Sequence, residues 1–225
     1  TAIKLSAYMD LTKKLFPALD GLIKSINDKA ESLEGTIKTG RTHLMDAMPI
    51  DFSEELKAWS SQLKSSKEML NVIETKFLKL PQGGTAVGSG INAHKQFAKL
   101  FAQEITKLTR NKYKFSPAKN FYHELSAQDC SVQLSGELKN LAVILMKISN
   151  DLRWMNSGPL AGISDIELKA LQPGSSIMPG KVNPVIPEAV AMASADVIGN
   201  DVSITVAAQS GSFQLNVMLP VIAYN

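Results

Sequence analysis

Apolar side chains recur with the period of an α-helix along most of the chain. The clearest stripe runs from residue 134 to residue 155, where steps of four and three residues alternate and place every apolar member on one helical face. Its members are Leu134, Leu138, Leu141, Leu145, Ile148, Leu152 and Met155. The pattern predicts a long helix that buries this stripe.

Two further long helices are predicted upstream. One covers residues 56–77 and follows Asp51 and Glu54, whose spacing is that of a capping box. The other covers residues 15–33, and Pro17 predicts a kink inside it. The first third of the chain is therefore expected to be mainly helical.

A fourth long helix, over residues 187–208, has a different pattern. Small or apolar residues occupy nearly every side of it, so we expect it to be surrounded by other helices. A shorter helix is predicted over residues 93–108. No segment shows a sustained alternation of apolar and polar residues with period two, which is the pattern of a half-buried strand. Together these patterns predict an all-α fold.

The predicted helices are long for a chain of 225 residues. Helices of about 28 to 32 residues measure roughly 42 to 48 Å at 1.5 Å per residue, whereas a compact globule of this size has a radius of gyration near ~17 Å. We therefore expect an elongated bundle of antiparallel helices, whose exposed apolar stripes are covered by copies of the same chain. A coiled-coil scaffold without chemistry is the alternative at this point.

Composition and charge exclude several classes of function. The 24 Lys and Arg residues barely exceed the 21 Asp and Glu residues, and the three arginines, Arg41, Arg110 and Arg153, are not clustered, so no nucleic-acid interface is expected. No apolar run approaches the roughly 18 residues of a membrane helix, so we expect no membrane partner. Cys130 is the single cysteine and cannot form an internal disulfide, which favours a reducing, cytoplasmic location.

Three connections between the predicted helices are rich in turn-forming residues: 36–49, 81–92 and 157–187. The last runs about 30 residues without a helical period, and loops of that length are usually functional or disordered. Its composition argues against disorder. We therefore expect this connection to carry function.

The segment 174–184 of that connection reads GSSIMPGKVNP. Its glycines let the backbone turn or lie against a ligand, and its prolines limit the freedom of the chain. Lys181 supplies a positive charge and Asn183 supplies oriented donors, a combination suited to holding a carboxylate. The alternative is a surface turn with a solvated lysine.

His43 follows Gly40 in the first of these connections, just after the end of a predicted helix. Taken alone, it is either a structural hydrogen bonder or a catalytic group. His94 and His123 have no comparable surroundings, and we expect them to be surface or core histidines. No two histidines share metal-ligand spacing with a cysteine or carboxylate, so no bound metal is expected.

Residues 83–90 read GGTAVGSG and invite comparison with a phosphate-binding loop. The comparison fails, because no Gly-Lys-Ser or Gly-Lys-Thr follows and no strand precedes the segment. A tight turn that lets two helices approach closely is the better interpretation. Thr85 or Ser89 could still contact a ligand.

Three segments in this order resemble the conserved segments of the fumarase/aspartase superfamily: GRTHLMDA at 40–47, GGTAVGSG at 83–90 and GSSIMPGKVNP at 174–184. The resemblance extends over essentially the whole chain. It implies a central helical domain over residues 1–225, with the N-terminal and C-terminal domains of the family absent. It also implies a homotetramer in which loops of three subunits form each active site around a small dicarboxylate.

The resemblance also implies roles for particular residues, with no metal and no organic cofactor. Ser175 resembles the catalytic base, His43 stands on the opposite side of the substrate, and Glu188 pairs with that histidine. Five residues are implied in substrate binding: Thr42, Ser176, Lys181, Val182 and Asn183. At the start of a buried helix, an unpaired Glu188 would also be costly, so a charged partner is expected.

Smaller features favour one branch of the superfamily. His43 within GRTHL and the segment 151–155 resemble the class II fumarases, which interconvert fumarate and L-malate. The segment 185–188 resembles aspartases as much as fumarases. Fumarate hydratase is therefore the expected activity, with aspartate ammonia-lyase as the alternative. An inactive helical scaffold of the same fold is the alternative outside the enzymes.

Overall fold

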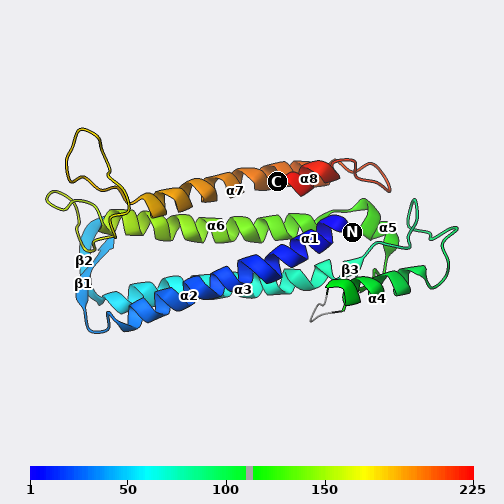
Figure 1. Ribbon diagram of the computed structural model, residues 1–225, viewed down its shortest axis with the longest axis horizontal. Helices are drawn as coiled ribbons and strands as arrows, with labels where there is room; N and C mark the ends of the chain where they lie inside the picture. The colour runs from blue at the N-terminus through cyan, green and yellow to red at the C-terminus, as the bar shows by residue number, and fades with distance from the viewer. Residues whose placement is uncertain (110–113) are drawn as a thin grey trace. The chain divides into compact units, whose positions relative to one another are not determined.

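Helices account for most of the chain in the computed structural model, which describes residues 1–109 and 114–225 (Figure 1). The helices are α1 (Ala2–Asp10), a π-helical turn η1 (Leu11–Leu15), α2 (Phe16–Glu31), α3 (Phe52–Phe77), α4 (Phe97–Thr109), α5 (Phe121–Ser126), α6 (Asp129–Met155), α7 (Val185–Gln209) and α8 (Leu219–Tyr224). The strands are β1 (Ile37–Thr42), β2 (Met45–Asp51), β3 (Lys79–Leu80) and β4 (Ser116–Pro117). The helical fold class predicted from the sequence is confirmed.

The described residues form two compact units. The first, called here the terminal unit, comprises residues 1–20, 66–138 and 199–225. The second, called the hairpin unit, comprises residues 21–65 and 139–198. The expectation that residues 1–225 make one helical domain stays a prediction.

Helix α3 buries the face that its sequence predicted. Within the hairpin unit Leu56, Trp59 and Leu63 are buried, and within the terminal unit Leu70 and Phe77 are buried. The stripe on α6 behaves in the same way, since each of its seven members is buried or half-buried. Burial of apolar area at about 25 cal/mol per Å² makes these two faces the main stabilising surfaces of their units.

The first turn of α3 is fixed by Asp51. One carboxylate oxygen accepts the backbone N–H of Ser53 at 2.8 Å and the other accepts the N–H of Gly35 at 2.8 Å. Hydrogen bonds from the Ser53 side chain and from these backbone groups lower the pKa of Asp51. Glu54 binds Lys57 instead of returning to the helix start, so only half of the predicted capping box forms.

The predicted kink near Pro17 takes the form of the π-helical turn η1. The N–H of Phe16 donates to the carbonyl of Leu11, one residue further back than in an α-helix. Because Pro17 has no N–H to donate, a wide turn directly before it relieves the backbone without ending the helix.

Helix α7 contradicts the prediction that it is surrounded on every side. One face of it is buried and carries Pro187, Ser194, Asp201, Ile204 and Ala207. The other face is open in the single chain, where Met192 is 68% exposed, Val202 62% and Ile186 58%. The sequence pattern correctly found a helix without a polar face, but one chain does not supply the neighbours for both sides.

Helix α7 also corrects the expectation about membrane length. It is long enough and apolar enough to cross a membrane, judged by length and composition alone. It is the one such helix among the described residues.

The turn-rich connection at residues 36–49, where the sequence predicted no strand, forms most of a β-hairpin. Strands β1 and β2 pair antiparallel from Ile37 opposite Asp51 to Thr42 opposite Met45. The period-two signal fails here because the hairpin is exposed along β2, so no apolar face alternates with a polar one. A short parallel pair, β3 with β4, lies within the terminal unit.

The glycine-rich connection in the terminal unit confirms the predicted tight turn. A Cβ atom added at Gly84 would lie 2.8 Å from Cβ of Phe121, and one at Gly88 would lie 2.6 Å from the backbone nitrogen of Tyr122. A Cβ at Gly83 would lie 2.6 Å from Cβ of Ala98. The glycines therefore let this turn approach α4 and α5 at backbone distance.

The packing of α3 predicts a sharp contrast between two neighbouring positions. Leu70 is fully buried, whereas Met69 is 50% exposed. Leu70→Ala should lower the free energy of unfolding by about 2–5 kcal/mol, because it removes buried methyl groups and leaves a cavity. Met69→Ala should change it by less than about 1 kcal/mol. Urea denaturation of the two variants measures the difference, and equal effects would contradict this packing.

Candidate active site

The predicted histidine segment forms the tip of the β1–β2 hairpin. Thr42 pairs with Met45, which leaves His43 and Leu44 as the two residues of the turn. Both have positive φ, 55° and 61°, and this is the pattern of a type I′ turn. Glycine and asparagine favour such positions, histidine tolerates them better than most residues, and leucine does not, so the strain of the tip lies mainly at Leu44, next to the histidine.

A β-bulge lies directly before this tip. The register shifts between Thr39 and Arg41, so that β2 carries one residue more than β1 at this point. Gly40 stands at the shift, where an added Cβ would lie 2.6 Å from the carbonyl oxygen of Met48. The bulge therefore requires glycine.

A cluster of charged side chains anchors the hairpin to the connection between α6 and α7. The guanidinium of Arg41 donates to both carboxylate oxygens of Asp165, at 2.7 and 3.4 Å. The ammonium of Lys38 lies 3.2 Å from the same carboxylate and 2.7 Å from the carboxylate of Glu55 on α3. In the hairpin unit, the hairpin and this connection therefore lie together at one end of the helices (Figure 1).

The electrostatics of the cluster favour its charged forms. Burial alone would raise the pKa of Asp165, but the hydrogen bonds from Arg41 and Lys38 outweigh it and hold the pKa below its ordinary value. The hydrogen bond to Asp165 raises the pKa of Arg41 in turn. Stability from the lowered Asp165 pKa is present above the ordinary pKa of about 3.8 and is lost as the pH falls through the folded-state value.

The signature segment folds into a closed loop with a narrow neck. The backbone N–H of Gly174 donates to the carbonyl of Lys181 at 2.7 Å, and the side-chain amide of Asn183 donates to the carbonyl of Gly174 at 3.3 Å. A Cβ at Gly174 would lie 2.8 Å from that Lys181 oxygen, so the neck can close only around glycine.

Ser175 is held just inside this neck. Its hydroxyl oxygen accepts the backbone N–H groups of Ile177 and Met178, each at 3.2 Å. Two amide donors on one hydroxyl oxygen stabilise negative charge there, and this is the condition under which a serine could give up its proton. Ser175 itself is half-buried, whereas Ile177 and Met178 are exposed.

The other predicted residues of the loop are more open. Ser176, Lys181 and Val182 are exposed on it, and Asn183 is half-buried, with one amide hydrogen used to close the neck. Glu188 lies in the first turn of α7 and is half-buried. The loop therefore brings together Ser175, Ser176, Lys181, Val182 and Asn183 within one segment.

The structure does not join the two halves of the predicted site within one chain. Thr42 and His43 are exposed at the hairpin tip. Among the described residues, no hydrogen bond or ion pair links His43 to Glu188 or to Ser175. The predicted charged partner of Glu188 is likewise not found within the described part of this chain.

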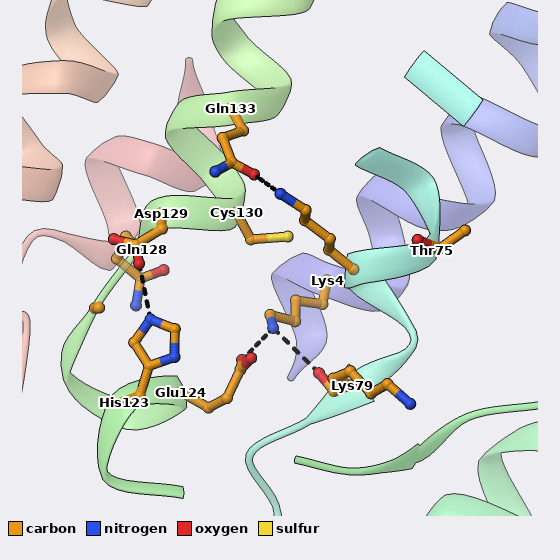
Figure 2. Close-up of a pocket in the computed structure, with 11 residues that line it drawn as sticks. Lys4, Thr75, Lys79, His123, Glu124, Gln128, Asp129, Cys130 and Gln133 are labelled. Atoms are coloured by element: carbon orange, nitrogen blue, oxygen red, sulfur yellow. Dashed lines mark hydrogen bonds and ion pairs between the residues drawn. The ribbon is translucent and has the colours of Figure 1, made fainter. Parts of the chain in front are cut away.

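His94 and His123, expected to be surface or core histidines, both lie at the surface. His94 accepts the N–H of Gln96 at its own turn. His123 lies 2.7 Å from Asp129 at the rim of a pocket of about 360 Å³ in the terminal unit, which Figure 2 shows. In the same pocket Lys4 binds Glu124 and the carbonyl of Lys79.

Cys130 also lines this pocket and is a free thiol. Burial raises the pKa of the thiol to about 11. A thiol with such a pKa is almost entirely protonated at neutral pH and is a poor nucleophile. All residues that line this pocket belong to the terminal unit, whereas all predicted catalytic and substrate-binding residues belong to the hairpin unit.

Sequence reasoning missed Lys38, Glu55 and Asp165. Arg41 was noticed only as one of three unclustered arginines. Nothing in the local sequence distinguishes Asp165 from a solvated carboxylate of a loop. Its role follows from a contact between residues 124 positions apart.

Comparisons with known proteins identify the family of this chain. A family model described as a lyase matches residues 1–199. The chain is 54% identical over its full 225 residues to a protein named fumarate hydratase class II 2 from Pseudomonas aeruginosa, of which it covers 49%. It is 55% identical over the same length to a fumarate hydratase class II from Xylella fastidiosa, of which it covers 47%.

The fold has a close match among solved structures. A crystal structure of recombinant class II fumarase from Schistosoma mansoni superposes with a TM-score of 0.96 at 37% sequence identity, and the match covers 100% of this chain and 50% of that one. The chain thus spans about half the length of the relatives it matches. It belongs to this lyase family, the fumarase/aspartase superfamily whose three segments it carries.

Proposed function

We propose that the chain is the central part of a class II fumarate hydratase, which interconverts fumarate and L-malate. The observation that carries this proposal is the state of Ser175, whose oxygen is held by two backbone donors in a loop that also presents Lys181. The names of the relatives agree with it. A cytoplasmic location stays a prediction.

The reaction needs stabilisation of a dianion. Removing a proton from the carbon next to a carboxylate puts a second negative charge on that carboxylate and forms an aci-carboxylate. Positive charge and hydrogen-bond donors that are already in place lower this barrier most effectively. Lys181 supplies the charge, and the second amide hydrogen of Asn183 supplies a donor beside it.

Ser175 acts as the base in this proposal. A serine hydroxyl is normally far too weak an acid to be deprotonated, so its alkoxide must be stabilised. The N–H groups of Ile177 and Met178 provide two donors, and the ammonium of Lys181 in the same loop adds a charge. The alkoxide accepts the proton from malate, and the resulting hydroxyl returns it to carbon in the hydration direction.

His43 completes the site on the other side of the substrate. It activates the water that adds to fumarate, and Glu188 orients the imidazole. Because neither residue contacts the other within the chain, we propose that His43 and Glu188 come from different subunits. This arrangement follows the shared sites that the family resemblance implies.

The exposed face of α7 supports such an assembly. Within the hairpin unit, Met192 and Ile186 are apolar side chains exposed to water, and copies of the same helix can cover them. Three carboxylates on α7, those of Glu188, Asp196 and Asp201, oppose the alternative of a membrane span. We propose a homotetramer built around this helix.

Aspartate ammonia-lyase is the second candidate. It needs the same dianion and the same serine loop, so Ser175 and Lys181 do not distinguish the two activities. His43 favours water addition, because an imidazole can activate water directly. An inactive scaffold is disfavoured, since nothing in the packing of α6 or α7 requires the two amide donors on Ser175.

The substrate can be decided with the full-length protein. We expect fumarate to appear, seen as its ultraviolet absorbance, when L-malate is added, and none to appear with L-aspartate. A response to aspartate alone would make the protein an ammonia-lyase.

Ser175→Ala should lower kcat by at least about a thousandfold, because no other group in the loop can take the proton. Binding of a dicarboxylate inhibitor, measured by calorimetry, should change by less than about threefold, since Lys181 and Asn183 remain. Ser176→Ala serves as the control and should retain far more activity. Equal loss of turnover and binding in Ser175→Ala would refute the assigned role.

Met192→Glu should weaken assembly, because it places a carboxylate in the apolar surface of α7. Light scattering after size-exclusion chromatography should show smaller particles than the wild type. Ser61→Glu, at an exposed position of α3, should leave the assembly unchanged. A Met192→Glu protein of wild-type size would count against α7 as the interface.

A further inference from the structure

The charged cluster around Asp165 joins four separate parts of the hairpin unit. Lys38 and Arg41 come from β1, Glu55 from α3 and Asp165 from the connection between α6 and α7. The ammonium of Lys38 also lies 3.3 Å from the sulfur of Met155 at the end of α6 and 4.9 Å above the ring of Phe52. A single ammonium therefore has partners on both helices and on the connection.

The cluster is largely removed from water. The side chain of Lys38 is 10% exposed and that of Asp165 is 14% exposed. By contrast, Asp46 approaches Arg41 from β2 with its Oδ1 3.7 Å from Nε, and its side chain is 83% exposed. Removing one member of a desolvated ion pair leaves the others uncompensated, whereas an exposed pair contributes little. Asp165 and Asp46 thus face the same guanidinium, but the ion pair with Asp165 contributes far more to holding it in place.

The cluster lies next to the part of the hairpin whose register is least fixed by pairing between its two strands. The pairing changes register at the bulge before Arg41, so the pairs from Ile37 to Thr39 do not fix the two pairs beyond it. A slip by one residue would turn the side chain of Arg41 to the other face of the hairpin. The contact with Asp165 prevents that slip, because it holds the guanidinium on one side with two hydrogen bonds.

We propose that Asp165 is a positioning residue for His43, acting through Arg41 to fix the last two strand pairs and the strained turn they carry. The proposal rests on the function proposed above, in which His43 activates the water that adds to fumarate. Arg41 precedes His43 by two residues, and Asp165 precedes Ser175 by ten along the other reactive segment.

The test compares Asp165→Asn with Asp46→Asn in the full-length protein. Both changes remove one negative charge that faces Arg41, but Asp165 is half-buried whereas Asp46 is exposed. Asp165→Asn should lower kcat by roughly 10- to 100-fold, because moving a catalytic group by about 1 Å has an effect of that size. KM should change by less than about threefold, since Lys181 and Asn183 are not touched. Asp46→Asn should stay within about twofold of the wild type in both constants.

Hydrogen exchange provides a readout that does not depend on activity. The amides of residues 37–51 should exchange at least about tenfold faster in Asp165→Asn and unchanged in Asp46→Asn. Asp165→Glu keeps the charge and should restore most of kcat and of the protection. All assays are run well below the melting temperature of each variant, so that unfolded protein does not lower the apparent kcat.

Two outcomes would overturn the proposal. One is an Asp165→Asn protein as active as Asp46→Asn. The other is a loss of activity that only follows the unfolded fraction, with exchange of the hairpin unchanged. If the wild type hydrates no fumarate, the proposed function fails, and the exchange of residues 37–51 still decides whether Asp165 fixes the hairpin.

Discussion

Burial of one face of α3 determines where the β1–β2 hairpin and its charged cluster lie in the hairpin unit. Leu56, Trp59 and Leu63 fix this helix in the unit, and its first turn then presents Phe52 and Glu55 to Lys38. The cap formed by Asp51 joins the same turn to the end of β2. Hydrophobic burial, which has no preferred direction, thus determines where the hydrogen bonds and ion pairs of the charged cluster can form.

The helices could be predicted from the sequence because their signals are periodic and local. The stripe on α6 and the seam on α3 are buried as their spacing indicated. The signature loop was found because glycines, a serine pair and a lysine stand within a few residues of one another. Its closed neck and the two donors on Ser175 are geometry that the composition alone did not predict.

The hairpin at 37–51 could not be predicted in this way. Its exposed strand has no alternation to detect, and its turn uses His43 and Leu44, where turn statistics favour glycine and asparagine. Asp165 was missed for a different reason, since its meaning comes from Arg41, far away in sequence. Local patterns find elements, whereas contacts between distant residues decide which charged side chains matter.

The loop that carries Ser175 and the turn that carries His43 differ in how they are held in place. The serine loop is closed by its own backbone and needs few outside contacts. The histidine turn is strained and depends on neighbours for its shape. In the proposed reaction, the self-closed loop carries the base for proton removal and the externally supported turn carries the group for water addition.

The uncovered side of α7 has a consequence for how such a protein survives heat and dilution. When subunits cover that side, folding and association become linked equilibria, so the melting temperature rises with protein concentration by mass action. Before the proposed assembly forms, a newly made chain exposes Met192 and Val202 to water. In that interval the exposed apolar side chains can be bound by chaperones, and the main risk is non-specific association before the correct subunits assemble.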